Sequence, residues 1–156
     1  MESLQFFRKM FDYDYWGNRE ALASLIGITG DATRAMRFFN HIIGAQRIWL
    51  SRFESPDPPT AEPWPSLTLE EAKAGVEELH GLWSALLEKM SPEKLAGLLA
   101  YRNTKGLEFK TPIHDVLMHL VMHSAYHRGQ VAAAVRDSAG TPAVTDYVVY
   151  VRKLRT

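Results

Sequence analysis

Apolar residues recur every three or four positions in four long segments of the chain, a spacing that places them on one face of an α-helix. The pattern predicts helices over residues 3–26, 32–53, about 68–90 and about 112–137. Polar residues fall on two of these apolar faces, Asp14 and Asn18 in the first helix and His41 in the second. A polar ring on an apolar face requires a partner, so His41 is expected to have a specific role inside the fold.

The expected helix starts carry residues that commonly cap helices. Asp31 is a candidate N-cap for the second helix. Thr68 followed by Glu71 forms the pattern of a capping box at the start of the third. Thr111 and Pro112 suit the N-cap and the first turn of the fourth.

The connections between these helices differ in length and composition. Residues 54–66 hold five of the eight prolines. Because proline cannot continue a helix, this segment is expected to be a surface crossover, long enough to travel the length of a bundle. Residues 98–111 alternate weakly around a turn at 103–106, which indicates a small hairpin or an extended loop. The final segment, 143–156, is compatible with either a short helix or a strand.

Four amphipathic helices with one long connection predict an all-α fold. We expect a four-helix bundle of up-down-down-up topology, with a long crossover between helices two and three and a small hairpin or loop before helix four. The length of 156 residues suits a single hydrophobic core, so residues 1–156 are expected to form one domain.

Composition excludes several classes of protein. Lys plus Arg and Asp plus Glu number 18 each, and this balance argues against a nucleic-acid partner, which usually requires a basic excess. The absence of cysteine excludes disulfides, a thiolate nucleophile and cysteine-containing zinc sites. We find neither the apolar run of a signal peptide nor the roughly 20 apolar residues that span a bilayer. A cytoplasmic protein without a membrane partner is therefore expected.

The segment HLVMHSAYHRGQV places His119, His123 and His127 at four-residue steps on the fourth predicted helix. Residues four apart on a helix have Cβ atoms roughly 5–6 Å apart, so two such imidazoles can bind one ion at about 2.0–2.1 Å each. His123 and His127 form such a candidate pair, and His41 is the natural third ligand. By itself the HxxxH pattern is also compatible with packing, and the HExxH motif of metalloproteases is absent.

Three motifs together resemble the DinB/YfiT-like family. They are YHRGQV at 126–131 after a histidine at 123, HIIGAQRIWLSR at 41–52, and YDYWGNREAL at 13–22. The match covers essentially the whole chain, in order. The resemblance implies a four-helix bundle in which His41, His123 and His127 hold a metal ion.

Further residues are candidates for the surroundings of this site. His119 lies about 80° around the helix from His127, so we interpret it as a neighbouring or structural histidine rather than a ligand. Gln130 lies one turn from His127 and could orient the ring or a bound water. Arg128 is interpreted as a surface charge or as a salt bridge within the bundle. Asp14 is the acidic residue that could reach the pocket.

By the resemblance, Tyr126, Trp16 and Asn18 line the pocket. As plain sequence they fit core packing, an aromatic residue at a helix end and a hydrogen bond within the bundle. His80 and His114 are expected to be solvated.

Three histidines leave a position on a divalent ion open for water or substrate, as in catalytic sites. Imidazole ligands suit zinc or nickel, with iron also possible. The resemblance implies enzymes that use a low-molecular-weight thiol, so a thiol-dependent transferase acting on a small molecule is expected, or a hydrolase using activated water. It also implies a homodimer. The alternatives are a non-catalytic stress-response protein that binds a metal or small ligand, and a bundle with buried histidines alone.

Overall fold

The computed structural model describes residues 2–155, and side chains from residue 3 onward. The long helices are α1 (Glu2–Ile26), α2 (Thr33–Glu54), α3 (Leu69–Lys89) and α5 (Ile113–Asp137). The short elements are α4 (Pro92–Leu95), β1 (Leu98–Arg102), β2 (Glu108–Pro112) and α6 (Tyr147–Lys153). The fold is thus a helical bundle with one small two-stranded sheet, as the hydrophobic pattern predicts.

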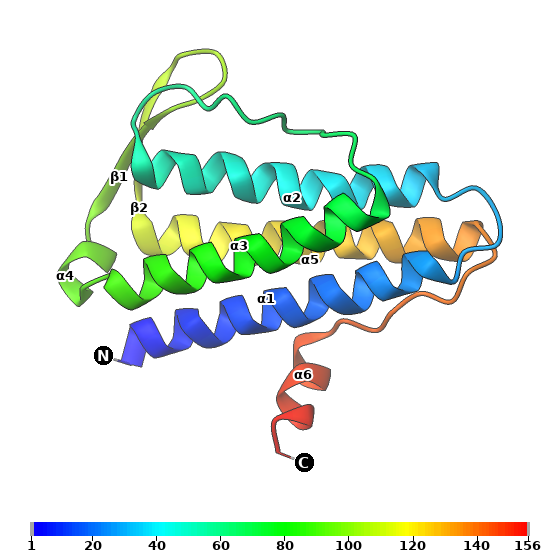
Figure 1. Cartoon of the computed structure of the whole chain (residues 1–156). Coiled ribbons are helices and arrows are strands. Elements are labelled where there is room, and N and C mark those ends of the chain that lie inside the picture. The colour runs from blue at the N-terminus through cyan, green and yellow to red at the C-terminus, as the bar shows by residue number, and fades with distance from the viewer. Residues whose placement is uncertain (1, 156) are drawn as a thin grey trace.

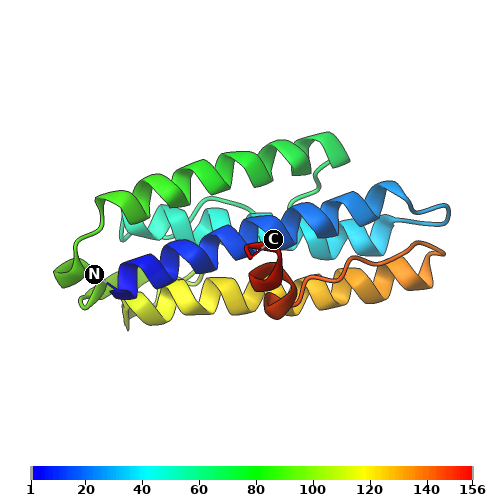
Figure 2. The same ribbon diagram turned by 90° about the horizontal axis from the view of Figure 1, so that it is seen from below.

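The four long helices pack side by side in a ring, because α1 contacts α3 and α5, and α2 contacts the same two helices. In Figure 1, α1 and α5 run in one direction and α2 and α3 in the other. The crossover after α2 runs back above that helix for most of its length before α3 begins (Figure 1). Seen from below, α1 lies between α3 and α5, and α6 crosses beneath it (Figure 2).

The apolar faces form the core. The stripe expected on the first helix consists of Leu4, Phe7, Phe11, Asp14 with Tyr15, Asn18, Leu22 and Leu25, and all of these are buried except Tyr15, which is half-buried. Trp83 of α3 is 1% exposed and packs against Phe11, with ring centroids 5.1 Å apart. Burial of such large side chains contributes roughly 1.5–3 kcal/mol each, so packing rather than helix propensity holds the bundle together.

Of the three predicted caps, only the capping box at Thr68 agrees with the structure, and Asp31 lies one residue before the N-cap. The capping box of Thr68 and Glu71 is present at α3. The Asp31 carboxylate accepts the Thr33 N–H at 2.9 Å, although Ala32 occupies the N-cap position of α2. The cap at Thr111–Pro112 is wrong. Both residues belong to β2, and α5 begins at Ile113 without a side-chain cap.

The hairpin and the C-terminal segment are now defined. Strands β1 and β2 pair antiparallel, with Leu98 opposite Pro112. Thr111 and Pro112, which were predicted to start a helix, are therefore part of a strand. The C-terminal segment, left open between helix and strand, forms α6 and docks on α1 through Tyr13, whose ring lies 5.1 Å from that of Tyr147.

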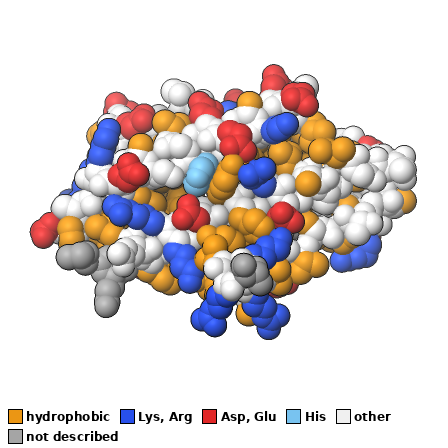
Figure 3. Space-filling view, turned by 60° about the horizontal axis from the view of Figure 1, so that its bottom comes forward, with side chains coloured by type: hydrophobic (Ala, Val, Ile, Leu, Met, Phe, Trp, Pro, Cys, Tyr) orange, Lys and Arg blue, Asp and Glu red, His pale blue; other side chains and the backbone are white. Residues whose placement is uncertain are grey.

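The surface is mixed in charge. The face that carries α1 and α6 shows acidic and basic side chains interspersed with hydrophobic ones (Figure 3). Within residues 2–155, no helix has the length and apolar character needed to cross a bilayer.

Candidate metal centre

Three histidines from two helices meet at one point of the bundle. His41 of α2 and His123 and His127 of α5 each offer a ring nitrogen, and these three atoms lie within 4.8 Å of one another. The Nε2 atoms of His123 and His127 are 3.2 Å apart. Two nitrogens bound to one tetrahedral ion at about 2.0–2.1 Å would be roughly 3.3 Å apart. The group can therefore hold a divalent metal ion.

The outer ring nitrogens of two histidines are held by oxygen atoms. His41 Nδ1 lies 2.6 Å from the carbonyl oxygen of Pro63, and His127 Nδ1 lies 2.6 Å from Oε1 of Gln130. Because these oxygens only accept hydrogen bonds, both Nδ1 atoms carry the proton. The lone pair of each ring is then on Nε2, and such outer partners fix ring orientation and raise ligand basicity in metal sites.

Burial keeps the rings of His123 and His127 in the neutral form that binds metal. Desolvation, together with the neighbouring His127 and His41, lowers the pKa of His123 to about 4. The pKa of His127 is lowered by desolvation as well, against an opposing effect of its hydrogen bond to Gln130. Both rings are thus neutral at physiological pH and have a lone pair free for an ion.

The crossover forms one wall of the site. Trp64 stacks on His41, with ring centroids 3.8 Å apart and planes inclined by 9°. This close approach depends on Gly44, where an added Cβ would lie 2.7 Å from the Pro63 carbonyl oxygen and 2.6 Å from that of Glu62. A Pro-rich segment remote from the histidines in sequence therefore positions one of them.

The site is not sealed. His127 is 8% exposed, whereas His41 and His123 are only partly buried. Two of the three histidines therefore keep partial contact with solvent, whereas the ligands of a closed structural site are usually fully enclosed.

Comparison with known proteins agrees with this geometry. The profile of the DinB family matches residues 26–154, which is most of the chain and includes all three histidines. The chain belongs to the DinB family. It is also 24% identical over 163 residues to Protein DinB of Bacillus subtilis (strain 168), an alignment that covers 95% of each protein.

In this DinB-family chain, the residues of α5 that were expected near the site differ in their contacts with the histidines. Gln130 contacts His127, as the sequence indicated. Tyr126 is 66% exposed and meets the His127 ring edge-on, with centroids 5.1 Å apart. His119 lies outside the three-histidine group, and its ring is 5.5 Å from both His123 and Trp49.

Of the two interpretations of Arg128, the salt bridge within the bundle is confirmed and the surface charge is wrong, because Arg128 is the centre of a buried polar network. It is 2% exposed and donates from Nη1 to Asp14 at 2.7 Å and to Asn18 at 2.9 Å. Asp14 also accepts from Asn18 and from Gln46, and Gln46 reaches Ser124. Asp14 and Asn18, expected near the metal, instead form this central network with Arg128.

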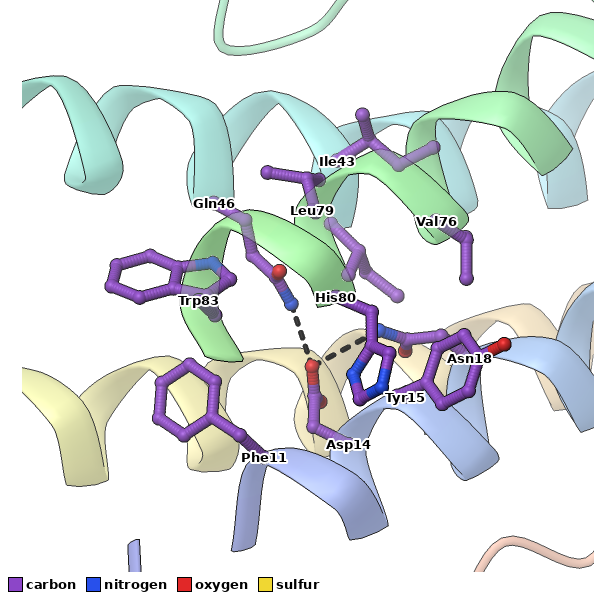
Figure 4. A pocket seen from close by; sticks show the side chains of 11 residues that line it. Phe11, Asp14, Tyr15, Asn18, Ile43, Gln46, Val76, Leu79, His80 and Trp83 are labelled. Carbon is purple, nitrogen blue, oxygen red and sulfur yellow. Dashed lines mark hydrogen bonds between the residues drawn. The ribbon is translucent and has the colours of Figure 1, made fainter. Parts of the chain in front are cut away.

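The network borders a small internal cavity between α1, α2 and α3 (Figure 4). The cavity offers ≈ 20 Å³ to the centre of a water molecule, which is room for about one water. His80 lies beside it and stacks on Tyr15 at 3.9 Å, so it is half-buried rather than solvated. His114 is exposed, as expected.

Trp16 does not line the histidine site in the contacts described. Its ring packs against Tyr13 and against Tyr150 of α6, 6.2 and 5.6 Å away. Trp16 thus takes part in the docking of the C-terminal helix α6.

Sequence reasoning missed the contributions of Pro63 and Trp64. Pro63 acts through its backbone carbonyl, which leaves no signal in residue type. For Trp64 a signal existed, because a large aromatic residue inside a proline-rich connection must find a surface to cover.

Proposed function

We propose that this chain, as one up-down-down-up bundle domain, is a divalent-metal-dependent enzyme acting on a small molecule. Its most specific form is a thiol-dependent transferase, and a hydrolase is the neighbouring possibility. The carrying observation is the convergence of three imidazoles, two of them only partly buried, on one point. DinB-family membership supports a role connected with metal.

A bound divalent ion would act as a Lewis acid that lowers the pKa of a coordinated thiol or water. The chain supplies the rest. Pro63 and Gln130 fix the rings of His41 and His127, so little reorganisation accompanies binding. Trp64 and Tyr126 border the site with aromatic surface, which limits access of bulk water to the reacting atoms.

The residues around the site favour a thiol over water. Among the described residues, the group that can hold an ion consists of histidines alone, without a carboxylate. The nearest acidic candidate from the sequence, Asp14, is paired with Arg128. A free thiol has a pKa of about 8.5 and water one near 15.7, so a thiol depends less on a protein base to lose its proton. In the proposed transfer, the thiolate sulfur bonds to the electrophile, the leaving group departs with its electron pair, and the thiol proton passes to solvent.

We further propose zinc or nickel as the ion, with iron as a third possibility, because neutral imidazoles suit all three. A cytoplasmic homodimer remains a prediction from the sequence.

The test is a pair of assays on tag-free protein loaded with Zn²⁺ or Ni²⁺. One assay follows conjugation of cysteine to 1-chloro-2,4-dinitrobenzene, and the other follows hydrolysis of 4-nitrophenyl acetate. Wild type, His123→Ala and the exposed-histidine control His114→Ala are compared. We expect thiol conjugation that is lost in His123→Ala and kept in His114→Ala.

Hydrolysis alone would replace the transferase with a hydrolase. Metal binding without either reaction across a wider panel of thiols and electrophiles would favour a non-catalytic metal-binding protein and contradict the proposal.

A further inference from the structure

Arg52 occupies an unusual position at the C-terminal end of α2. Its residue exposure is 9%, and its guanidinium carbon lies 4.2 Å from the ring centroid of Trp49 and 4.6 Å from that of Tyr101. Trp49 comes from α2 and Tyr101 from β1, so the hairpin completes an aromatic clamp around the cation. Such a clamp fixes the direction of the guanidinium.

The clamped cation has no anionic partner. Across residues 2–155, no carboxylate forms an ion pair with Arg52, and its buried Nε atom has no hydrogen-bond acceptor. The other buried arginine, Arg128, also has nitrogens without an acceptor, Nε and Nη2, but its Nη1 pairs with a carboxylate and an amide oxygen. The difference is therefore the missing anionic partner of Arg52. Buried cations are normally paired, so an unpaired one with fixed donors indicates a group that arrives from outside.

Arg52 is connected to the histidine centre through two rings. Trp49 contacts Arg52 on one side and His119 on the other, and His119 in turn lies 5.5 Å from His123. The Arg52 charge contributes to lowering the pKa of His119, after desolvation. His119 is exposed, and no hydrogen bond to its ring is found within the described part of the chain. Its single N–H is therefore free to donate to a ligand.

We propose that Arg52 and His119 bind the anionic group of the small molecule whose reacting atom binds at the histidine centre. The group is an oxyanion, a carboxylate or a phosphate, since the guanidinium fork matches both. This inference rests on the proposed function, and it narrows the substrate class to anionic molecules. The four-residue spacing of the histidines gave no role to His119, and in this proposal it becomes a substrate-binding residue.

The fold also limits the length of such a ligand. His41 and Arg52 are eleven residues apart on α2, about 16 Å along the axis at 1.5 Å per residue. His119 lies one turn from His123, about 6 Å along α5. Several bonds must therefore separate the anionic group from the atom that binds the ion.

The experiment uses the Co²⁺-loaded protein, in which thiolate binding gives a charge-transfer absorption band. The probes are alkyl thiols of three to eight carbons that end in a carboxylate, a phosphonate or a neutral hydroxyl group. At one chain length, we expect an anionic probe to bind wild type about tenfold more tightly than the alcohol, as a charge-assisted hydrogen bond would give. The tighter of the two anions identifies the group.

Variants separate contact from general charge. Arg52→Met should remove the preference, Arg52→Lys should keep part of it, and His119→Ala should weaken it while Co²⁺ affinity stays the same. Arg47→Met is the control, because Arg47 lies on the same helix but pairs with Glu78 at 3.2 Å. Since Arg52→Met removes part of the core, its fold is checked by circular dichroism, and His119→Ala at an exposed position gives an independent reading.

Equal binding of all three probes to wild type, or a preference that survives in both Arg52 variants and in His119→Ala, would overturn this inference and leave the metal centre intact. Loss of the preference in Arg47→Met would do the same, because it would show an effect of net charge alone. Failure of wild type to bind Co²⁺, or of any thiol to reach the bound ion, would overturn the proposed function and this inference with it.

Discussion

The bundle contains two clusters of polar groups that differ in how they are satisfied. In the central network, both carboxylate oxygens of Asp14 accept hydrogen bonds, from donors that include Arg128 and Gln46. In the histidine centre, nitrogens of the same kind point at one another, with two Nε2 atoms 3.2 Å apart. A network of complementary partners stabilises the fold by itself. A cluster of converging imidazole nitrogens can instead present lone pairs to a cation from outside.

The largest expected effect comes from breaking the central network. Arg128→Met leaves the Asp14 carboxylate buried without its cation, and we expect the free energy of unfolding to fall by about 3–5 kcal/mol. Urea denaturation followed by circular dichroism measures it. The control is Arg34→Met, which removes a solvent-exposed ion pair with Asp137 and should change stability little. A loss no larger in Arg128→Met than in the control would contradict the structural role of the network.

The histidine centre should gain stability only from metal. With Zn²⁺ at a free concentration of 100 times its Kd, wild type should gain about 2.7 kcal/mol in the free energy of unfolding, because the ion binds the folded state. His127→Ala should gain almost nothing. The measurement is urea denaturation with and without Zn²⁺. An equal gain in wild type and variant would show that the ion binds elsewhere.

A smaller effect should follow from moving the crossover. In Gly44→Ala the new Cβ would meet the carbonyl oxygens of Glu62 and Pro63, so the hydrogen bond to His41 cannot keep its geometry. Loss of such an outer partner typically lowers metal affinity 10–100-fold, and we expect about tenfold, measured by competition with a chromophoric chelator.

Gly81→Ala is the matched control for that change. An added Cβ there has no heavy atom within 4 Å, so metal affinity should stay the same and α3 should become slightly more stable. Equal affinity of the two alanine variants would mean that the crossover does not position His41.

The smallest effect concerns His119, which has the same four-residue spacing as His123 and His127 but is not expected to be a metal ligand. Because His119 lies outside the three-histidine group, His119→Ala should keep the Zn²⁺ affinity of wild type to within about twofold, well inside the change that one ligand would cause. The same chelator competition measures it. A loss as large as that of His123→Ala would place His119 among the ligands.

The two clusters were also unequally predictable from sequence. Four-residue spacing on a helix brings His123 and His127 to one face, and a polar ring on an apolar stripe marked His41, so local periodicity was enough for the histidine centre. Arg128 was not predictable in this way. Its burial depends on Gly17 of α1, where a Cβ would lie 2.8 Å from Arg128 Nε, and one sequence does not show which helices face each other.

The fold shows the same division between local and non-local information. The capping box at Thr68 uses residues three apart and was predicted. The predicted start of α5 lies within one residue of Ile113, but the predicted cap at Thr111 was wrong because Thr111 pairs with Leu99 in the hairpin, and strand pairing overrides a local capping signal. The contact of Pro63 with His41 joins residues 22 apart through a backbone carbonyl, so no pattern of residue types could indicate it.

The central claim is that His41, His123 and His127 hold one divalent ion. The most direct test is elemental mass spectrometry combined with X-ray absorption spectroscopy on tag-free wild-type protein. We predict about one ion per chain, with three imidazole nitrogens at about 2.0–2.1 Å and an additional light atom from solvent. A protein that binds no ion after incubation with Zn²⁺ or Ni²⁺, or an ion whose nearest shell lacks imidazole, would contradict the account.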